Sequence, residues 1–217
     1  MASYRTTAVP VALPETLYRS LVWLDYRLAV VFSLGLPLVL LIWAAVRREG
    51  ALVRLMQIYW KVASLLLIST LLLANQRPLG FVLVLVGQLL LIGAVWFWVD
   101  LNEELADLPP WRALPLTIRM WRWSLTVWAL VGALFSLTSL ACLGKAAMAG
   151  PRCAAWLEAP QGLNDQLAGV FGFVFGATWT PTLSGFVGYV ALVAYVVGLL
   201  QWVVVRLPKQ GRVAGEF

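Results

Sequence analysis

Histidine is entirely absent from this chain. Its absence removes the usual haem and zinc ligand and the usual general base near neutral pH. It also excludes hydrolases that depend on a Ser-His-Asp or Cys-His site. Charged residues are scarce as well, at 12%, whereas 62% of residues are apolar, a balance that soluble domains do not have. The composition therefore predicts an integral membrane protein without a recognisable catalytic constellation.

The apolar residues come in blocks, and many of the twelve tryptophans lie beside block ends, as an aromatic belt at the membrane surface requires. Five blocks are long enough to cross a bilayer as helices: 28–46, 55–74, 79–99, 124–143 and 183–205. Three other segments, at 15–27, 111–123 and 167–177, are too polar or too short and predict interfacial or re-entrant helices; 15–27 also fits a flared end of the first span. We therefore predict an all-α, polytopic integral membrane protein, with residues 1–217 forming a single membrane domain.

Four polar or helix-breaking residues interrupt these blocks or lie at their edges. Pro37 lies in the middle of the first block, where a proline removes one backbone hydrogen bond and predicts a kink. Gln88 lies in the middle of the third block; a helix-to-helix hydrogen bond is its ordinary role, and a substrate contact is the alternative. Asp25 and Arg27 lie at the edge of the first block, where they favour interface anchoring over a proton or ion path.

Lysine and arginine divide unequally between the two sides that five alternating spans define. One side collects ten of these residues and the other six. The positive-inside rule therefore predicts a cytoplasmic C-terminus and a lumenal or periplasmic N-terminus. The segment Met1–Pro14 lacks the pattern of a cleavable signal peptide. Because the basic residues are scattered over short loops, we expect the lipid bilayer, and not nucleic acid, as the partner of the net charge of +6.

The two cysteines, Cys142 and Cys153, both fall at or beyond the outer end of the fourth predicted span. An outside compartment permits disulfides. A bond that closes this short loop would stabilise the protein by roughly 2–3 kcal/mol in the chain-entropy model. We expect the two residues to pair, and two unpaired small apolar side chains are the alternative.

An acidic stretch, W-F-W-V-D-L-N-E-E-L-A-D-L-P-P over Trp96–Pro110, follows the third predicted span. Its four acids recur at helical spacing, and the double proline predicts the end of the helix. Carboxylates at this spacing are possible ligands for a hard metal, but a solvated helix end with salt bridges to nearby cations is the interpretation that we favour. The candidate cluster comprises Asp100, Glu103, Glu104, Asp107, Arg54 and Lys61. The spacing predicts that Asp100 and Glu104 face the second span, and that Glu103 and Asp107 face a partner or solvent.

Four segments together resemble a family of small polytopic membrane proteins found in cyanobacteria and known as a domain of unknown function. They are S-L-V-W-L-D-Y-R-L-A-V-V-F (20–32), V-R-L-M-Q-I-Y-W-K-V-A-S-L-L (53–66), W-F-W-V-D-L-N-E-E-L (96–105) and K-Q-G-R (209–212). The similarity covers about Leu17 to Arg212, and the third segment is its most specific part. The resemblance implies a cyanobacterial thylakoid or plasma membrane and an association with photosynthesis; it supplies no catalytic residues.

These observations favour a non-enzymatic integral membrane auxiliary or peripheral subunit that supports the assembly or stability of a photosynthetic membrane complex. The alternative is a small oligomeric transporter or channel, and a membrane enzyme that uses the acids of 100–107 ranks third. We expect other membrane proteins as partners. Lipid, carotenoid or chlorophyll are possible ligands between the helices, with a backbone carbonyl, a water molecule or Gln88 in place of histidine.

Overall fold

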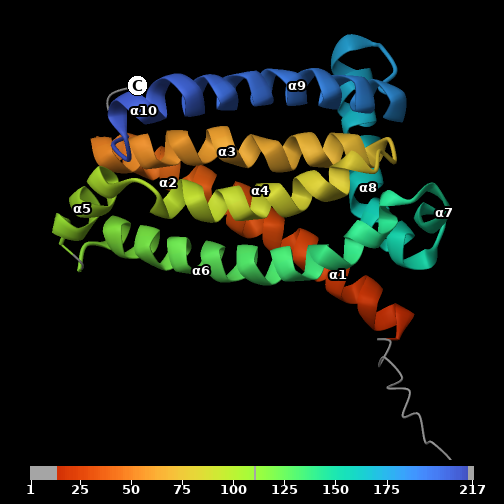
Figure 1. Cartoon of the computed structure of the whole chain (residues 1–217), viewed down its shortest axis with the longest axis horizontal. Coiled ribbons are helices and arrows are strands. Elements are labelled where there is room, and N and C mark those ends of the chain that lie inside the picture. The colour runs from red at the N-terminus through yellow and green to blue at the C-terminus, as the bar shows by residue number, and fades with distance from the viewer. Residues whose placement is uncertain (1–13, 110, 215–217) are drawn as a thin grey trace, which may run out of the picture.

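In the computed structural model the chain folds as a bundle of long helices, most of which run along one direction (Figure 1). The structure describes residues 14–109 and 111–214. Within these residues there is no strand, and five helical segments are long and apolar enough to cross a membrane: Glu15–Arg47, Gly50–Ala74, Leu79–Trp96, Ala113–Leu143 and Pro181–Lys209. The predicted all-α, polytopic membrane fold is confirmed.

The chain order of the elements is as follows: α1 (Glu15–Ala29), η1 (Val30–Gly35), α2 (Leu36–Arg47), α3 (Gly50–Ala74), α4 (Leu79–Trp96), α5 (Val99–Asp107), α6 (Ala113–Ser136), η2 (Leu137–Leu143), α7 (Lys145–Met148), α8 (Pro151–Phe175), α9 (Pro181–Gln201), η3 (Trp202–Arg206) and α10 (Leu207–Gln210). Helix α3 lies at the centre and packs against α2, α4, α8 and α9. Its fully buried side chains, among them Met56 and Tyr59, join the main apolar core.

The first span is longer than the sequence predicted, because no boundary separates 15–27 from 28–46. Helices α1, η1 and α2 continue without a break over 33 residues. Tyr18 and Val22 are buried against α8 and the end of α6, where Trp156 and Phe135 pack beside them. Of the two alternatives for 15–27, the continuous helix agrees with the end of the first span and not with a separate helix, because tertiary contacts hold this segment in line with the span.

Pro37 changes the helix geometry one turn before it. The backbone of η1 is a π-helix, in which the amide of Leu36 bonds the carbonyl of Val31. Since Pro37 has no amide hydrogen, the carbonyls of Phe32 and Ser33 lose their usual donors. Two side chains from other helices replace these donors: Trp121 Nε1 donates to Phe32 O, and Tyr59 OH donates to Ser33 O, both at 2.9 Å. The helix distortion predicted at Pro37 is thus the place where side chains of α3 and α6 form hydrogen bonds with the backbone of the first span.

The fourth span also begins earlier than predicted. Helix α6 continues through Trp123 without interruption, and Ile118, Trp121 and Leu125 on either side of the predicted boundary are buried in the core. Residues from Ala113 onward are therefore the first part of α6 and not a separate helix; their position at the membrane interface stays a prediction. The third span instead ends at Trp96, because the chain turns at Phe97 and Trp98 before α5 begins.

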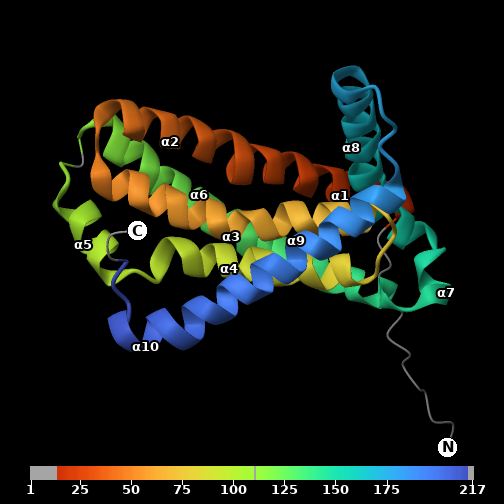
Figure 2. The same cartoon turned by 90° about the horizontal axis from the view of Figure 1, so that it is seen from above.

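The predicted short segment at 167–177 is the second half of a 25-residue helix, α8. Figures 1 and 2 show that α8 lies across the long axis of the bundle, and Figure 2 shows that its second half extends beyond the spans. Phe173 is 92% exposed, and Val170, Val174 and Phe175 are exposed beside it. The expected packing of this segment under neighbouring helices is therefore wrong, because these side chains are exposed; the choice between a re-entrant and a surface-lying segment stays a prediction.

The two ends of the bundle carry different features. The α2–α3 turn, α5 and α10 lie at one end, whereas the start of α1, the α3–α4 turn and α8 lie at the other (Figures 1 and 2). The segment for which the sequence predicts no cleavable signal falls, except for Pro14, outside the described residues, as does Pro110 of the double proline.

Candidate functional site

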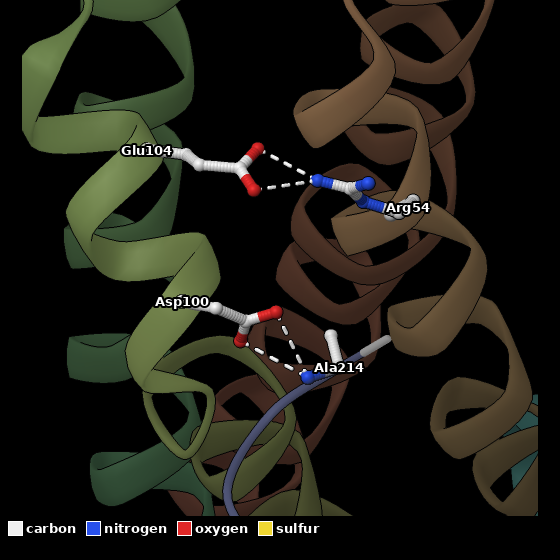
Figure 3. Close-up of polar contacts among 4 residues, drawn as sticks. All are labelled: Arg54, Asp100, Glu104 and Ala214. Atoms are coloured by element: carbon white, nitrogen blue, oxygen red, sulfur yellow. Dashed lines mark hydrogen bonds and ion pairs between the residues drawn. The ribbon is translucent and has the colours of Figure 1, made fainter. Parts of the chain in front are cut away.

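The acidic stretch folds as the short helix α5, which lies against α3 at one end of the bundle. Leu101 and Leu105 are buried in the main core, and their burial fixes the rotation of α5 about its own axis. Glu104 is thereby directed toward α3, where both of its carboxylate oxygens accept hydrogen bonds from Arg54 Nη2 at 2.7 Å (Figure 3). Both side chains are partly exposed, so the pair contributes about 0–1 kcal/mol to stability.

Asp100 binds a different part of the chain from the one that the sequence predicted. Its two carboxylate oxygens accept the backbone amide of Ala214 at 3.0 and 2.9 Å (Figure 3). The same terminal segment is held at two further points: Val99 N donates to Arg212 O, and Arg212 Nε donates to Phe97 O. Asp100 therefore fixes the C-terminal segment against the start of α5, and Glu104 alone of these two acids faces the second span.

Arg119 closes the other end of α5. Its Nη2 donates to the carbonyl of Leu105 at 2.8 Å and to those of Ala106 and Leu108 at 3.2 Å. These carbonyls lie at the C-terminal end of the helix, where the backbone leaves acceptors unpaired and a cation is favoured. The basic segment 111–123 thus acts as a helix cap, a role that its composition did not indicate.

Arg122 is the most deeply buried charged side chain at this end, with 5% of its surface exposed. It donates to the carbonyl of Val95 and to Oδ1 of Asn102, which joins the end of α4 to α5. Its guanidinium carbon lies 4.1 Å from the centre of the Trp96 ring, whose Nε1 donates to Thr126. The sequence reasoning missed this residue; the available signal was a charged side chain beside the long apolar run that follows it, and in the structure it is the tenth residue of α6.

The remaining members of the predicted cluster lie apart from these contacts. Glu103 and Asp107 are exposed on α5, in agreement with the spacing argument. Lys61 lies seven residues beyond Arg54 on α3 and lines a groove between α3, α4 and α9. Among the described residues, no group of three or more metal-binding side chains is found. The arrangement therefore consists of a braced helix with two outward acids.

The two cysteines lie at the opposite end of the bundle. Cys142 and Cys153 form a disulfide with their Cα atoms 5.7 Å apart, within the distance that the bond requires. The bond joins η2 to the first turn of α8. Nearby, Glu158 of α8 accepts from Arg19 Nε at 3.0 Å and from Trp23 Nε1 at 2.8 Å, so α8 is also tied to α1.

A third polar arrangement lies inside the spans, between α1, α4 and α6. Ser136 donates to Gln88 Oε1 at 3.1 Å, which confirms the predicted helix-to-helix hydrogen bond of Gln88. Trp128 Nε1 donates to Asp25 at 3.0 Å. A Cβ atom on Gly132 would lie 2.5 Å from Gln88 Nε2 and 3.0 Å from Asp25 Oδ1, so this glycine leaves room for both side chains. Asp25 therefore faces the bundle interior.

An open groove of about 680 Å³ adjoins this arrangement, and its lining includes Asp25, Trp128 and Gly132 among mostly apolar side chains of α1 and α6. Ionisable residues inside a span that face the bundle interior commonly mark ion or proton paths or ligand contacts. The placement of Asp25 corrects the interpretation that it lies at the edge of a span as a surface anchor.

Five apolar helices with a polar junction at one end define a polytopic, all-α integral membrane protein. The model of the family described as "Protein of unknown function (DUF3177)" matches residues 19–215, and the chain belongs to this family. No curated protein and no solved structure matches the chain. The resemblance to a family of unknown function is thereby confirmed, whereas its cyanobacterial origin remains an expectation.

Proposed function

We propose that the protein is a non-enzymatic auxiliary subunit that docks on a larger membrane complex through the exposed face of α5. In this proposal the complex lies in a cyanobacterial thylakoid or plasma membrane and serves photosynthesis; the support for this part is the resemblance described above. In this proposal the subunit supports assembly or stability and performs no chemistry.

The observation that carries the proposal is the bracing of a nine-residue helix that leaves two acids outward. Asn102 and Glu104 contact arginines of α6 and α3, and Asp100 binds the C-terminal segment. Glu103 and Asp107 remain exposed on the same helix. A rigid element presents such charges in one fixed geometry, and complementary charges on a partner then give specificity and a faster encounter. This arrangement suits docking better than a freely solvated helix end.

Charge reversal tests the docking role directly. We expect the double variant Glu103→Lys/Asp107→Lys to leave monomer stability within about 1 kcal/mol of the wild type, because exposed charges contribute little. It should weaken the co-purification of partner proteins, most visibly as salt is raised. Asp165→Lys is the matched control, since Asp165 is an exposed acid on α8 at the opposite end.

Two outcomes would reject the proposal. Retention of every partner by the double variant shows that these acids do not dock. A large loss of monomer stability shows instead that they are structural.

A second candidate function, a small oligomeric transporter or channel, is favoured by the placement of Asp25 beside Gln88 and Trp128 inside the spans. Proton or ion flux into liposomes that contain the purified protein tests it. A flux that Asp25→Asn abolishes supports transport; equal flux in both proteins, or none, removes this candidate.

A further inference from the structure

Helix α9 packs closely against α3 only near its own beginning. Its buried residues are Ser184, Gly185 and Gly188, and the two glycines lie against Asn75 and Leu72 of α3. Beyond this point α9 diverges from α3 and α4 toward α10, as Figure 2 shows. A groove of about 820 Å³ lies between α3, α4 and the second half of α9. In a bilayer such a space must be filled, because apolar walls cannot face a void without losing contacts.

The walls of the groove match one acyl chain in one leaflet. They run along α9 from Tyr195 to Leu207, about 18 Å at 1.5 Å per residue, close to the roughly 15 Å of half a hydrocarbon core. Gly93 and Gly198 line opposite walls, and a Cβ atom added at either would meet nothing within 4 Å. The absence of side chains at these two positions therefore leaves the space open. A rigid polyene long enough to cross the whole bilayer would extend beyond it.

The same groove contains donors and positive charge. Among the residues that the structure describes, the lining includes the cations Lys61 and Arg206 and no carboxylate. Trp98 also lines it; this indole is 6% exposed, and its buried Nε1 has no hydrogen-bond partner within the described residues. Trp98 and Arg206 lie at the ends of α4 and α9 that adjoin α5, where a headgroup would be placed. Basic pockets between spans are typical binding sites for anionic lipid headgroups.

We propose that this groove binds one anionic phospholipid. Its phosphate contacts Lys61, Arg206 and the indole N–H of Trp98, and one acyl chain lies along Gly93 and Gly198. The site does not depend on docking through α5, because none of its lining residues belongs to that helix. The lipid would fill the space between the diverging helices at the end where Trp202 reaches across to Phe97 and Trp98.

Lipid retention measured by native mass spectrometry tests the proposal. The full chain is placed in nanodiscs that contain equal amounts of phosphatidylglycerol and phosphatidylcholine with identical acyl chains, and the lipids that remain bound after release are counted. Gly93→Leu and Gly198→Leu fill the groove, and Lys61→Gln/Arg206→Gln removes its charge. Gly169→Leu is the matched control for volume, because a Cβ atom there also meets nothing within 4 Å. Arg47→Gln, an exposed cation at the same end of the bundle, is the matched control for charge.

The wild type and both controls should retain one phosphatidylglycerol in preference to phosphatidylcholine. Each leucine variant should lose the bound lipid, and the double glutamine variant should lower the preference by about tenfold or more, as expected for two cations near a headgroup. Thermal unfolding in detergent confirms that each variant is folded, and if one leucine variant fails to fold, the other and the charge variant decide. Equal retention of the two lipids by the wild type, retention by folded leucine variants, or recovery of a carotenoid or chlorophyll in place of lipid would overturn the proposal.

Discussion

Individual polar side chains in the interior of this bundle mostly serve the backbone. Tyr59 and Trp121 satisfy the carbonyls released by Pro37, and Arg122 satisfies the carbonyl at the end of α4. In a hydrocarbon environment an unpaired backbone group costs several kcal/mol, and water is absent to replace a missing donor. Because the buried side chains of Tyr59 and Trp121 supply the missing donors, α1, η1 and α2 can continue as one span past Pro37.

The first prediction concerns Tyr59. We expect Tyr59→Phe to lower the free energy of unfolding by about 1–3 kcal/mol, because the buried carbonyl of Ser33 loses its donor while the ring is kept. Thermal or denaturant unfolding in detergent measures the change. Tyr189→Phe, at an exposed position on α9, is the control and should be nearly neutral. Equal stability of the two variants would show that this hydrogen bond does not matter.

The second prediction concerns Gly132. An alanine Cβ would lie 2.5 Å from Gln88 Nε2, so Gln88 must move although Ser136 holds it. We expect Gly132→Ala to destabilise the protein by about 1–3 kcal/mol, as overpacking does. Gly169→Ala, where the new Cβ meets nothing within 4 Å, should be neutral or slightly stabilising. A stable Gly132→Ala protein would show that the contact between α4 and α6 is loose.

At the scale of elements, α8 is the unusual helix. It crosses the bundle axis, and its first half is fixed by the disulfide and by Glu158, whereas its second half exposes Phe173 and its neighbours. Asn164 and Ser184 bond each other at 2.5 Å, which ties α8 to the start of α9. An apolar helix end that lies beside the spans suits the interface of the membrane.

The third prediction concerns the attachment of α8. We expect mass spectrometry under non-reducing conditions to find Cys142 and Cys153 joined. Cys142→Ser should lower stability by about 2–3 kcal/mol, since it releases the loop that the bond closes. Treatment of the wild type with a membrane-permeant reductant should reproduce this loss. Two free thiols in the mature protein, or no stability change in the variant, would contradict the prediction.

At the scale of the whole molecule, the two ends of the bundle differ in chemistry. One end carries α5, the C-terminal segment and the arginine contacts, whereas the other carries the disulfide and α8. The distribution of ten and six basic residues predicts that the first end is cytoplasmic. Which end faces the cytoplasm remains a prediction, and the disulfide is consistent with an oxidising compartment at the other end.

The fourth prediction tests this orientation. Single cysteines replace Asp107 and Asp165, two exposed acids at opposite ends, in a background without the native cysteines. A membrane-impermeant thiol reagent applied to intact, oriented membranes should label Asp165→Cys from the outer face. Asp107→Cys should react only after the membrane is opened. The reverse pattern of labelling would overturn the assigned topology.

The sequence by itself determined the fold class, the five spans, the pairing candidates Cys142 and Cys153, and the outward direction of Glu103 and Asp107. These features depend on local properties: the length of apolar runs, the spacing of acids along one helix and a short separation between cysteines. They can be predicted because they involve little information from distant parts of the chain.

Only the tertiary structure decided which helices are continuous, where Asp100 binds and that Arg122 and Asp25 face the interior. A polar residue near a span end can face a headgroup or a neighbouring helix at similar cost, and the choice depends on acceptors from distant segments. For Arg122 these acceptors come from α4 and α5, and for Asp100 the donor comes from Ala214, 114 residues away. Such contacts leave no local periodicity, which is why composition alone left open whether 15–27 begins the first span and did not show that most of 111–123 is continuous with α6.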